Sequence, residues 1–288
     1  MKLSFAIISY KSDHLLSKLL GKISRKHEVI VIENSLQDKT KNKIEKKFQN
    51  SKVIIPEKNL GYASAFNKAL KMSKNNFLIT ISPDVQIDKK LISKIENVLN
   101  KFKNFSLMAP EYRNKKIYQN FVPLTKPNDI VKIKNYKMLR VKEIDWCFCI
   151  INKSKFKQSK ILDENFFLYF ETIDLCKKLL LDRKKMYIIK NLKFNHLGTS
   201  SSNKKYEFAI RLNRNWHFSW SKFYFFKKHN SYLYALKKVL PNIYQNFIGI
   251  IISIIRLNSL NIKLHKASLS GVLSSIFLKK SLYRPNIK

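Results

Sequence analysis

Glycine, cysteine and acidic residues are scarce in this sequence of 288 residues. It holds five glycines, three cysteines, and 19 Asp or Glu against 57 Lys or Arg. The cysteines, Cys147, Cys149 and Cys176, are odd in number and form no Cys-x-x-Cys pair. This pattern excludes a disulfide framework and a zinc ribbon, and it suits a reducing cytosol. Hydrophobic residues reach 45%, which is enough for a core and excludes general disorder.

Glycine-rich phosphate loops and long apolar runs are also missing. Neither GxGxxG nor GxxxxGK[ST] occurs, so neither a Rossmann dinucleotide site nor a P-loop is expected. The apolar run near the start is too short for a signal peptide and predicts a strand. No run of about 18 apolar residues exists, since the nearest candidate, FIGIIISII at 247–255, is much shorter. The sequence therefore predicts no transmembrane helix.

The formal net charge of +38 is extreme and has three interpretations. Lysine and arginine neutralise the phosphates of nucleic acid. They are also attracted to the anionic surface of a membrane. The third interpretation is mutational bias in an AT-rich genome, since Lys, Asn and Ile are all abundant. The basic residues are spread along the whole chain, which favours bias for most of them.

Short apolar runs alternate with segments of helical spacing in the first 109 residues. Such alternation predicts an α/β fold with a doubly wound, mostly parallel sheet and helices on both faces. The expected strands are 3–9, 28–32, 52–55, 77–81 and 105–109, and the expected helices are 13–23, 38–48, 61–72 and 88–102.

The pattern changes in the second half of the chain. Residues 111–142 predict a loop-rich insertion, followed by strands at 145–151 and 187–189. From Lys204 onward the chain is helical, aromatic and basic. We place a boundary near Ser200, which predicts a catalytic domain at 1–202 and a C-terminal helical extension at 203–288.

Polar residues follow four expected strands at their carboxyl ends, where ligands bind in such sheets. Each group alone is weak evidence for a binding site, because Asn, Ser and Asp are common turn formers. The four groups together predict one cleft. They are Ser9 with Tyr10, Glu33 with Asn34, Asn59 with Gly61, and Ser82 with Asp84. Without a glycine-rich loop, we expect a metal to bridge the phosphates of a ligand, and Asp84 is an oxygen donor suited to Mg²⁺ or Mn²⁺.

A second cluster holds two carboxylates. Glu171 and Asp174 are three residues apart and so lie on one face of a helix. They follow FFLYF, an apolar wall that would raise a carboxyl pKa and poise a general base. The alternative is that these acids simply stabilise a helix N-terminus. His196, after the last expected strand, is either structural or a second metal ligand beside Asp84.

At this point the sequence resembles the rhamnosyltransferase-like branch of the inverting family-two glycosyltransferases. The resemblance covers residues 3 to about 202, with agreeing order and spacing. Its motifs are ENSLQD, NLGYASAFNKAL, SPDV (the N-P-D form of a D-x-D motif), DWCFCIINKSKF, LDENFFLYFETIDLCKKL and HLGTSS. The later RNWHFSWSKFYFFKKH resembles the tail of some of these enzymes.

The resemblance implies a GT-A fold and a nucleotide-sugar donor. Ser9 and Glu33 would bind the nucleoside of the donor, and Tyr10 and Asn34 would also be donor-binding. Asn59, Gly61 and Asn67 would line its pocket, with Ala63 and Ala65 keeping the helix start low beside it. Asp84 would hold the metal on the diphosphate, with His196 as a second ligand. Glu171 would be the base for the acceptor hydroxyl, with Asp174 as helper or helix anchor.

Three positions depart from the family pattern. Thr172 stands where the family's usual base, an Asp, is expected. Ser82 replaces Asn, and residues 147–150 replace the expected W-x-x-G-A. A catalytically inactive protein with this fold is therefore an alternative.

The basic and aromatic tail at 211–229 suits either single-stranded nucleic acid or an interfacial helix on anionic lipid. The neighbouring apolar segment 243–257 favours the membrane, although these helices would also serve simply to cover the catalytic domain. We expect a cytoplasmic enzyme, peripheral on the inner face of the cell membrane, and no nucleic-acid partner. The expected acceptor is a glycan or a polyprenyl-linked glycan in cell-surface polysaccharide synthesis. At the family level dTDP-rhamnose is the first donor, with UDP-galactofuranose and UDP-glucose as alternatives.

Overall fold

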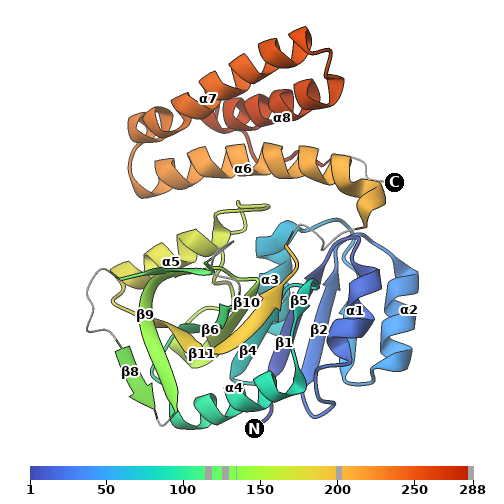
Figure 1. Cartoon of the computed structure of the whole chain (residues 1–288), viewed down its shortest axis with the longest axis vertical. Helices are drawn as coiled ribbons and strands as arrows, with labels where there is room; N and C mark the ends of the chain where they lie inside the picture. Colours follow the sequence, from blue (N-terminus) through green and yellow to red (C-terminus); the bar gives the residue numbers. More distant parts are fainter. Residues whose placement is uncertain (114–118, 125–129, 134, 199–202, 285–288) are drawn as a thin grey trace. The chain divides into compact units, whose positions relative to one another are not determined.

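A computed structural model describes residues 1–113, 119–124, 130–133, 135–198 and 203–284 (Figure 1). The predicted boundary at Ser200 lies outside these residues. The chain forms two compact units. The sheet unit consists of Met1–Leu60, Ser64–Leu162 and Thr172–Asn203, and the helical unit consists of Gly61–Ala63, Asp163–Glu171 and Lys204–Lys288. The helical unit thus takes in two short segments that we predicted to belong to the catalytic domain.

The sheet unit contains a mixed, mostly parallel sheet, as predicted. Its strand order is β3-β2-β1-β4-β10-β6-β11-β9-β7, with β5 paired to β11 and β8 paired to β9. The strands are β1 Ser4–Ser9, β2 Glu28–Glu33, β3 Ser51–Ile54, β4 Phe77–Ile81, β5 Val85–Gln86, β6 Leu107–Tyr112, β7 Phe121–Pro123, β8 Ile130–Ile133, β9 Tyr136–Ile144, β10 Phe148–Asn152 and β11 Met186–His196.

Parallel pairing sets the geometry of the candidate site. β1 runs parallel to β2, with Ser4 beside Glu28 and Ser9 beside Glu33. β1 is also parallel to β4, with Ala6 beside Thr80. The carboxyl ends of these three strands therefore lie at one edge of the sheet.

Helices flank this sheet because their apolar faces match its buried strands. They are α1 Asp13–Leu20, α2 Asp38–Lys47, α3 Gly61–Met72, α4 Lys89–Lys101 and α5 Glu171–Leu181, with a short 3₁₀ helix at Lys153–Lys155. The β-branched and aromatic strand residues are buried almost without exception in β1, β2 and β4. Continuous burial of this kind is typical of strands covered on both faces.

The prediction of a loop-rich insertion at 111–142 is wrong in part. Within its described residues the chain forms β7, β8 and most of β9. In β9 the buried residues Met138, Val141 and Ile144 are three apart, so no period-two alternation is visible in the sequence. Strand β11 is also much longer than the three residues predicted. Its second half carries polar residues, which an apolar-run pattern does not detect, but it pairs with β6 and β5.

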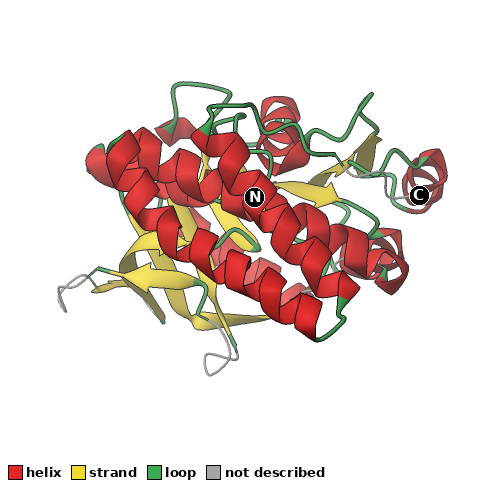
Figure 2. Cartoon of the chain, turned by 90° about the horizontal axis from the view of Figure 1, so that it is seen from above, coloured by secondary structure: helices red, strands yellow, loops and turns green. Residues whose placement is uncertain are grey.

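The helical unit contains three long helices packed side by side (Figure 2). They are α6 Glu207–His229, α7 Tyr232–Ile255 and α8 Ser259–Ile276, preceded by a 3₁₀ turn at Lys204–Tyr206. Four of the eight aromatic residues of α6 are buried, namely Trp216, Trp220, Phe223 and Phe225. The helical extension predicted from Lys204 onward is therefore present, and its aromatics form packing surfaces.

Candidate functional site

The ends of β1 and β2 are joined by one buried carboxylate. Ser9 donates a hydrogen bond of 2.6 Å to Glu33 Oε2, and the Ser35 backbone donates one of 2.8 Å to Glu33 Oε1. The Ser35 hydroxyl also donates to Oε1. Ser9 and Glu33 are 0% and 1% exposed. Glu33 therefore organises this edge from beneath rather than presenting an open carboxylate.

The open side of this edge consists of half-buried residues. Tyr10 is half-buried, and burial, with a contribution from the Glu33 charge, raises the pKa of its phenol. The backbone N–H of Lys11 donates to the Ser35 hydroxyl at 3.2 Å. Ser35 belongs to the polar group expected after the second strand and lies inside the quoted ENSLQD motif, whereas no sequence pattern points to Lys11. The predicted residues Ser9, Tyr10 and Glu33 are thus brought together, with these two neighbours at the surface.

Asn34 connects this edge to the segment after β3. Its N–H donates to the Ser9 carbonyl at 2.8 Å, and its Oδ1 accepts from the Leu60 N–H at 3.3 Å. Asn34 is buried, whereas Asn59 is half-buried. The Asn34 side chain therefore fixes the turn that leads into α3 and leaves Asn59 as the more accessible amide.

Gly61 adopts the tight turn that its glycine predicted. Its φ is 72°, and a Cβ at this position would lie 2.3 Å from the carbonyl oxygen of Phe167. The neighbouring Tyr62 N–H donates to that same carbonyl at 2.8 Å. Both the backbone angle and the close approach therefore require glycine. Ala63 and Ala65, however, are fully buried, so the prediction that they border an open pocket is wrong.

Asn67 has a structural role in place of the predicted contact with the donor. It is 2% exposed. Its Oδ1 accepts from the backbone N–H groups of Ile161 and Leu162, each at 3.1 Å, and its Nδ2 donates to the Leu162 carbonyl at 2.8 Å. The amide is thus committed to a distant loop, and the prediction that it binds a ligand does not agree with this arrangement.

Asp84 and His196 come together from positions 112 residues apart in the chain. His196 Nε2 lies 3.1 Å from Asp84 Oδ1. The Leu197 N–H also donates to the Asp84 carbonyl at 3.1 Å, next to the pairing of β5 with β11. Burial lowers the pKa of His196, but the hydrogen bond to Asp84 and the charge of that carboxylate outweigh it, so the pKa is raised. Because β1 and β4 are parallel neighbours, this pair lies at the same sheet edge as Ser9.

The Asp84 and His196 side chains suit a metal that is bound chiefly by its substrate. The described residues contain no group of three or more His, Cys, Asp or Glu side chains placed to hold a metal. Mg²⁺ commonly uses one or two carboxylates, several waters and substrate phosphates rather than a full protein cage. One carboxylate with one imidazole therefore fits such a metal, provided that a diphosphate supplies further ligands.

Asp145 is a further candidate, for which the sequence predicts no individual role. Its side chain is exposed, and its carboxylate accepts from the Cys147 N–H at 2.8 Å. Loss of hydration among the surrounding protein groups raises its pKa, and the Asp84 charge raises it further. Its electrostatic interactions with Asp84 and His196 place it near that pair. The quoted DWCF motif was the signal that could have identified it.

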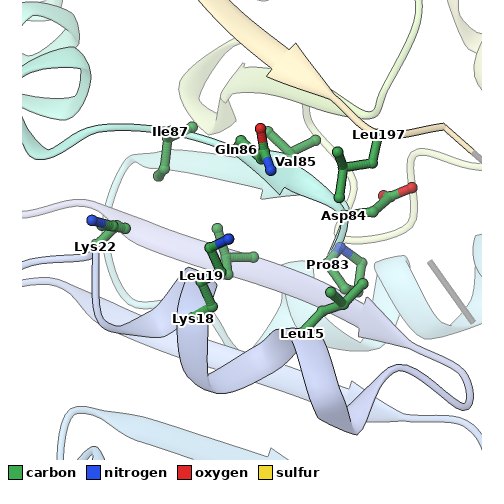
Figure 3. A pocket seen from close by; sticks show the side chains of 10 residues that line it. All are labelled: Leu15, Lys18, Leu19, Lys22, Pro83, Asp84, Val85, Gln86, Ile87 and Leu197. Atoms are coloured by element: carbon green, nitrogen blue, oxygen red, sulfur yellow. The ribbon is translucent and has the colours of Figure 1, made fainter. Parts of the chain in front are cut away.

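A pocket of about 270 Å³ adjoins Asp84 on the side of α1. Figure 3 shows Leu15, Lys18 and Leu19 of α1, and Lys22 just after this helix, across from Pro83 and the residues that follow it. Asp84 lies at its border with Leu197. The walls are mainly apolar, whereas the Ser9–Glu33 pair does not line the pocket. The pocket is therefore a neighbour of the polar edge and not the edge itself.

In the helical unit, Glu171 follows a segment that α6 holds in place. Ser221 donates to the Leu168 carbonyl at 2.9 Å, and Lys228 pairs with Asp163 at 2.5 Å. Tyr169 and Phe170, immediately before Glu171, both have positive φ values, 69° and 68°. The helical unit thus fixes an unusual backbone path directly before the candidate base.

Glu171 and Asp174 differ in their surroundings. Glu171 is 6% exposed and is the first residue of α5. Asp174, in the sheet unit, is fully buried and pairs with Lys178 at 2.9 Å, one helical turn later. This geometry agrees with the helix-anchor role that we considered for Asp174.

Comparison with known proteins gives one family model, described as glycosyl transferase family 2, which matches residues 4–159. A curated relative is the low-salt glycan biosynthesis hexosyltransferase Agl10 of Haloferax volcanii, 25% identical over 187 residues. The match covers 60% of this chain and 60% of that protein.

Solved structures resemble the chain over nearly its full length. The mannosyltransferase PcManGT from Pyrobaculum calidifontis, in complex with GDP-Man and Mn²⁺, has a TM-score of 0.57 at 11% identity, covering 96% of this chain and 88% of that one. S. aureus TarS 1-349 has a TM-score of 0.55 at 16% identity, covering 95% and 91%. At such identities the likeness shows the fold, and that fold is GT-A.

Proposed function

Since the chain belongs to glycosyl transferase family 2, we propose that it transfers a sugar from a nucleotide-diphosphate donor to a glycan or lipid-linked acceptor. The observation that carries this proposal is the polar edge of the sheet, where the Ser9–Glu33 pair and the Asp84–His196 pair follow neighbouring parallel strands. Ligands of α/β sheets bind at this end of the strands.

The nucleoside side of the donor binds at the ends of β1 and β2. Glu33, held by Ser9 and Ser35, keeps this edge rigid from beneath. Tyr10 and Ser35, which are half-buried, provide the surface that meets the nucleoside. Asn34 fixes the turn toward Gly61 through the Leu60 N–H. The more accessible amide of Asn59 binds the donor, which lies between the β2 and β3 ends.

Asp84 and His196 would hold a divalent metal, Mg²⁺ or Mn²⁺, together with the donor diphosphate. When bound, such a metal neutralises the charge of the departing nucleoside diphosphate. Binding requires that His196 lose its proton, because only a neutral imidazole is a ligand. The complexes of PcManGT with GDP-Man and Mn²⁺, and of GalNAc-T7 with UDP, GalNAc and Mn²⁺, support this assignment by analogy.

Glu171 is the catalytic base, taking the proton from the acceptor hydroxyl as that oxygen attacks the anomeric carbon. A single displacement inverts the configuration at that carbon. Thr172 has no carboxylate, so Glu171 replaces the Asp expected there. Asp174 anchors α5 through Lys178 rather than acting on the substrate.

The sugar is a hexose or rhamnose, with dTDP-rhamnose the first donor to test before UDP-galactofuranose and UDP-glucose. The product belongs to cell-surface polysaccharide synthesis, a role supported by the glycan-building hexosyltransferase among the relatives. The protein acts in the cytoplasm, peripheral on the inner face of the cell membrane. The excess of Lys and Arg over Asp and Glu and the apolar helix α7 support this location.

The nucleic-acid alternative gains no support from the tail. Stacking platforms for bases require exposed aromatic side chains. Of the eight aromatic residues of α6, Trp216, Trp220, Phe223 and Phe225 are instead buried by at least 93%, and Phe218 alone among the eight is exposed. The other alternative is a catalytically inactive protein. Measured turnover of a nucleotide sugar would exclude it.

The test is release of nucleoside diphosphate from a panel of nucleotide sugars, followed by transfer with the best donor. We expect Glu171→Gln to lower the rate of transfer by about 10²- to 10⁴-fold, the usual contribution of a general base, with donor affinity unchanged. Glu164→Gln, an exposed carboxylate of the same segment, is the matched control. Wild-type rates in Glu171→Gln together with loss in Asp174→Asn would show that the base is misassigned.

A further inference from the structure

Helix α7 has two apolar faces, and the helical unit covers one of them. Ala235 and Val239 are buried and pack in a cluster with Phe223 of α6 and Val272 of α8. Ser253 lies on the same face and is also buried. This inner face accounts for the packing of α7 within the unit.

The opposite face is apolar but exposed. Its large side chains recur at spacings of three, four and seven residues, so they form one stripe along the helix. We call this the outer stripe: Leu233, Leu240, Tyr244, Phe247, Ile251 and Ile254, which are between 46% and 76% exposed. The 18-residue window of α7 that is apolar enough to cross a membrane is 11% buried. A continuous exposed stripe of this length marks an interaction surface.

The charge of the helical region identifies the partner. Residues 204–288 contain 16 Lys or Arg and one acidic residue, Glu207. A second copy of this chain would carry the same positive charge and would be repelled. Anionic lipid headgroups attract such a region, and the acyl chains beneath them receive apolar side chains.

We propose that the outer stripe docks into the surface of an anionic phospholipid bilayer, with α7 lying in the plane of the membrane. The inference rests on the membrane association proposed above and assigns the surface responsible for it. The 24 residues of α7 give a length of about 36 Å, so length alone also permits crossing.

Crossing is disfavoured by the neighbours of α7. Its inner face packs on α6 and α8, and α8 carries the exposed residues Lys263 and Lys266. A spanning α7 would draw these charges into hydrocarbon or lose its inner packing. An in-plane α7 leaves the lysines in water, as in interfacial amphipathic helices.

The first experiment is co-sedimentation of the full chain with vesicles of phosphatidylcholine, with and without phosphatidylglycerol, at low salt. We expect binding to the anionic vesicles, which added salt weakens. The triple variant Leu240→Ser, Phe247→Ser, Ile254→Ser should bind at least about tenfold more weakly. Leu181→Ser is the matched control, because Leu181 is 73% exposed but lies on α5. Its binding should equal that of the wild type.

The second experiment measures how deeply residues of α7 lie in the bilayer. The three native cysteines are buried, and burial raises the pKa of each, so a thiol-reactive dye will label an introduced cysteine selectively. The dye is attached in turn to Leu240→Cys, Phe247→Cys and Ile254→Cys. In all three variants we expect its fluorescence to be quenched best by a lipid with a shallow spin label. Positions 240 and 254 are about 21 Å apart along a helix, so a spanning helix would instead show graded depth. Graded depth would overturn the in-plane arrangement.

The remaining outcomes separate the two proposals. Wild-type protein that stays in the supernatant with both kinds of vesicle refutes membrane association itself, and with it the docking surface. Anionic binding that the triple variant retains in full refutes the outer stripe while membrane association stands. A wild-type dimer that the triple variant abolishes would show a second copy on this face and overturn the lipid assignment. Donor-dependent thermal stabilisation, measured on the same variants, reports on the glycosyltransferase proposal separately.

Discussion

At the scale of single residues, Gly61 combines a positive φ with the close approach of Phe167. We expect Gly61→Ala to lower the free energy of unfolding by about 1–3 kcal/mol, because both strain and a clash are introduced. Gly198→Ala is the matched control, since Gly198 also has positive φ but nothing lies within 4 Å of an added Cβ. Urea unfolding measures both. Equal destabilisation would show that the contact with Phe167 contributes nothing.

Single residues also show what the sequence reveals and what it hides. The glycine at position 61 predicted a tight turn because few other residues adopt that backbone angle. The amide of Asn67 was misread because its partners, the backbone of Ile161 and Leu162, are 94 and 95 residues away. Local sequence carries no signal for such a contact. Asp84 and His196 are even further apart, by 112 residues. Metal-ligand chemistry and the family resemblance, rather than local sequence, linked them.

At the scale of elements, α6 is tied to the end of the described chain through a buried neutral histidine. His217 Nε2 lies 2.9 Å from the Tyr283 carbonyl oxygen, and Nδ1 lies 2.9 Å from the Ser281 hydroxyl. Burial is the largest cause that lowers the pKa of His217 from 6.5 to about 3, and the nearby Arg284 charge lowers it further. The folded helix therefore keeps this imidazole unprotonated in mild acid.

This shift makes stability depend on pH. Below the ordinary histidine pKa the unfolded chain takes up a proton that the folded chain does not, so stability is complete above that value and falls as pH falls toward about 3. The expected loss is up to about 1.4 kcal/mol per pH unit within that window. Denaturant unfolding followed by tryptophan fluorescence measures it, since Trp216 and Trp220 lie on α6.

The comparison for this prediction is His217→Gln, which removes the titrating group. Its stability should fall less steeply in acid than that of the wild type. A remaining slope is expected from His27, because burial lowers the pKa of that residue also. Identical slopes in the two proteins would contradict the account of His217.

Elements differ in how well their patterns predicted them. Strands β1, β2 and β4 are buried on both faces, so their apolar runs are visible in the sequence, and α3 is found at its predicted limits. Strand β9 is half-exposed and its buried residues are three apart. Its pairing with β11 comes from tertiary packing, which periodicity does not report.

At the scale of the whole molecule, the chain has a GT-A sheet unit and a basic helical unit that also takes in residues 163–171. The alternation of strands and helices predicted the first unit, and the composition after Lys204 predicted the helices of the second. The inclusion of residues 163–171 was not predictable, because it depends on side chains of α6 such as Ser221 and Lys228.

The central claim is that this protein binds a nucleotide-sugar donor through Asp84 and a divalent metal. The most direct measurement is the thermal shift of the chain with a panel of nucleotide sugars, with and without Mn²⁺, in the wild type and in Asp84→Ala. Asp182→Ala, which removes an exposed carboxylate at the end of α5, is the control. The account predicts that at least one donor stabilises the wild type and the control only with Mn²⁺, and that Asp84→Ala loses this response. Metal-dependent stabilisation that survives in Asp84→Ala, or a panel in which no nucleotide sugar stabilises the wild type, would contradict it.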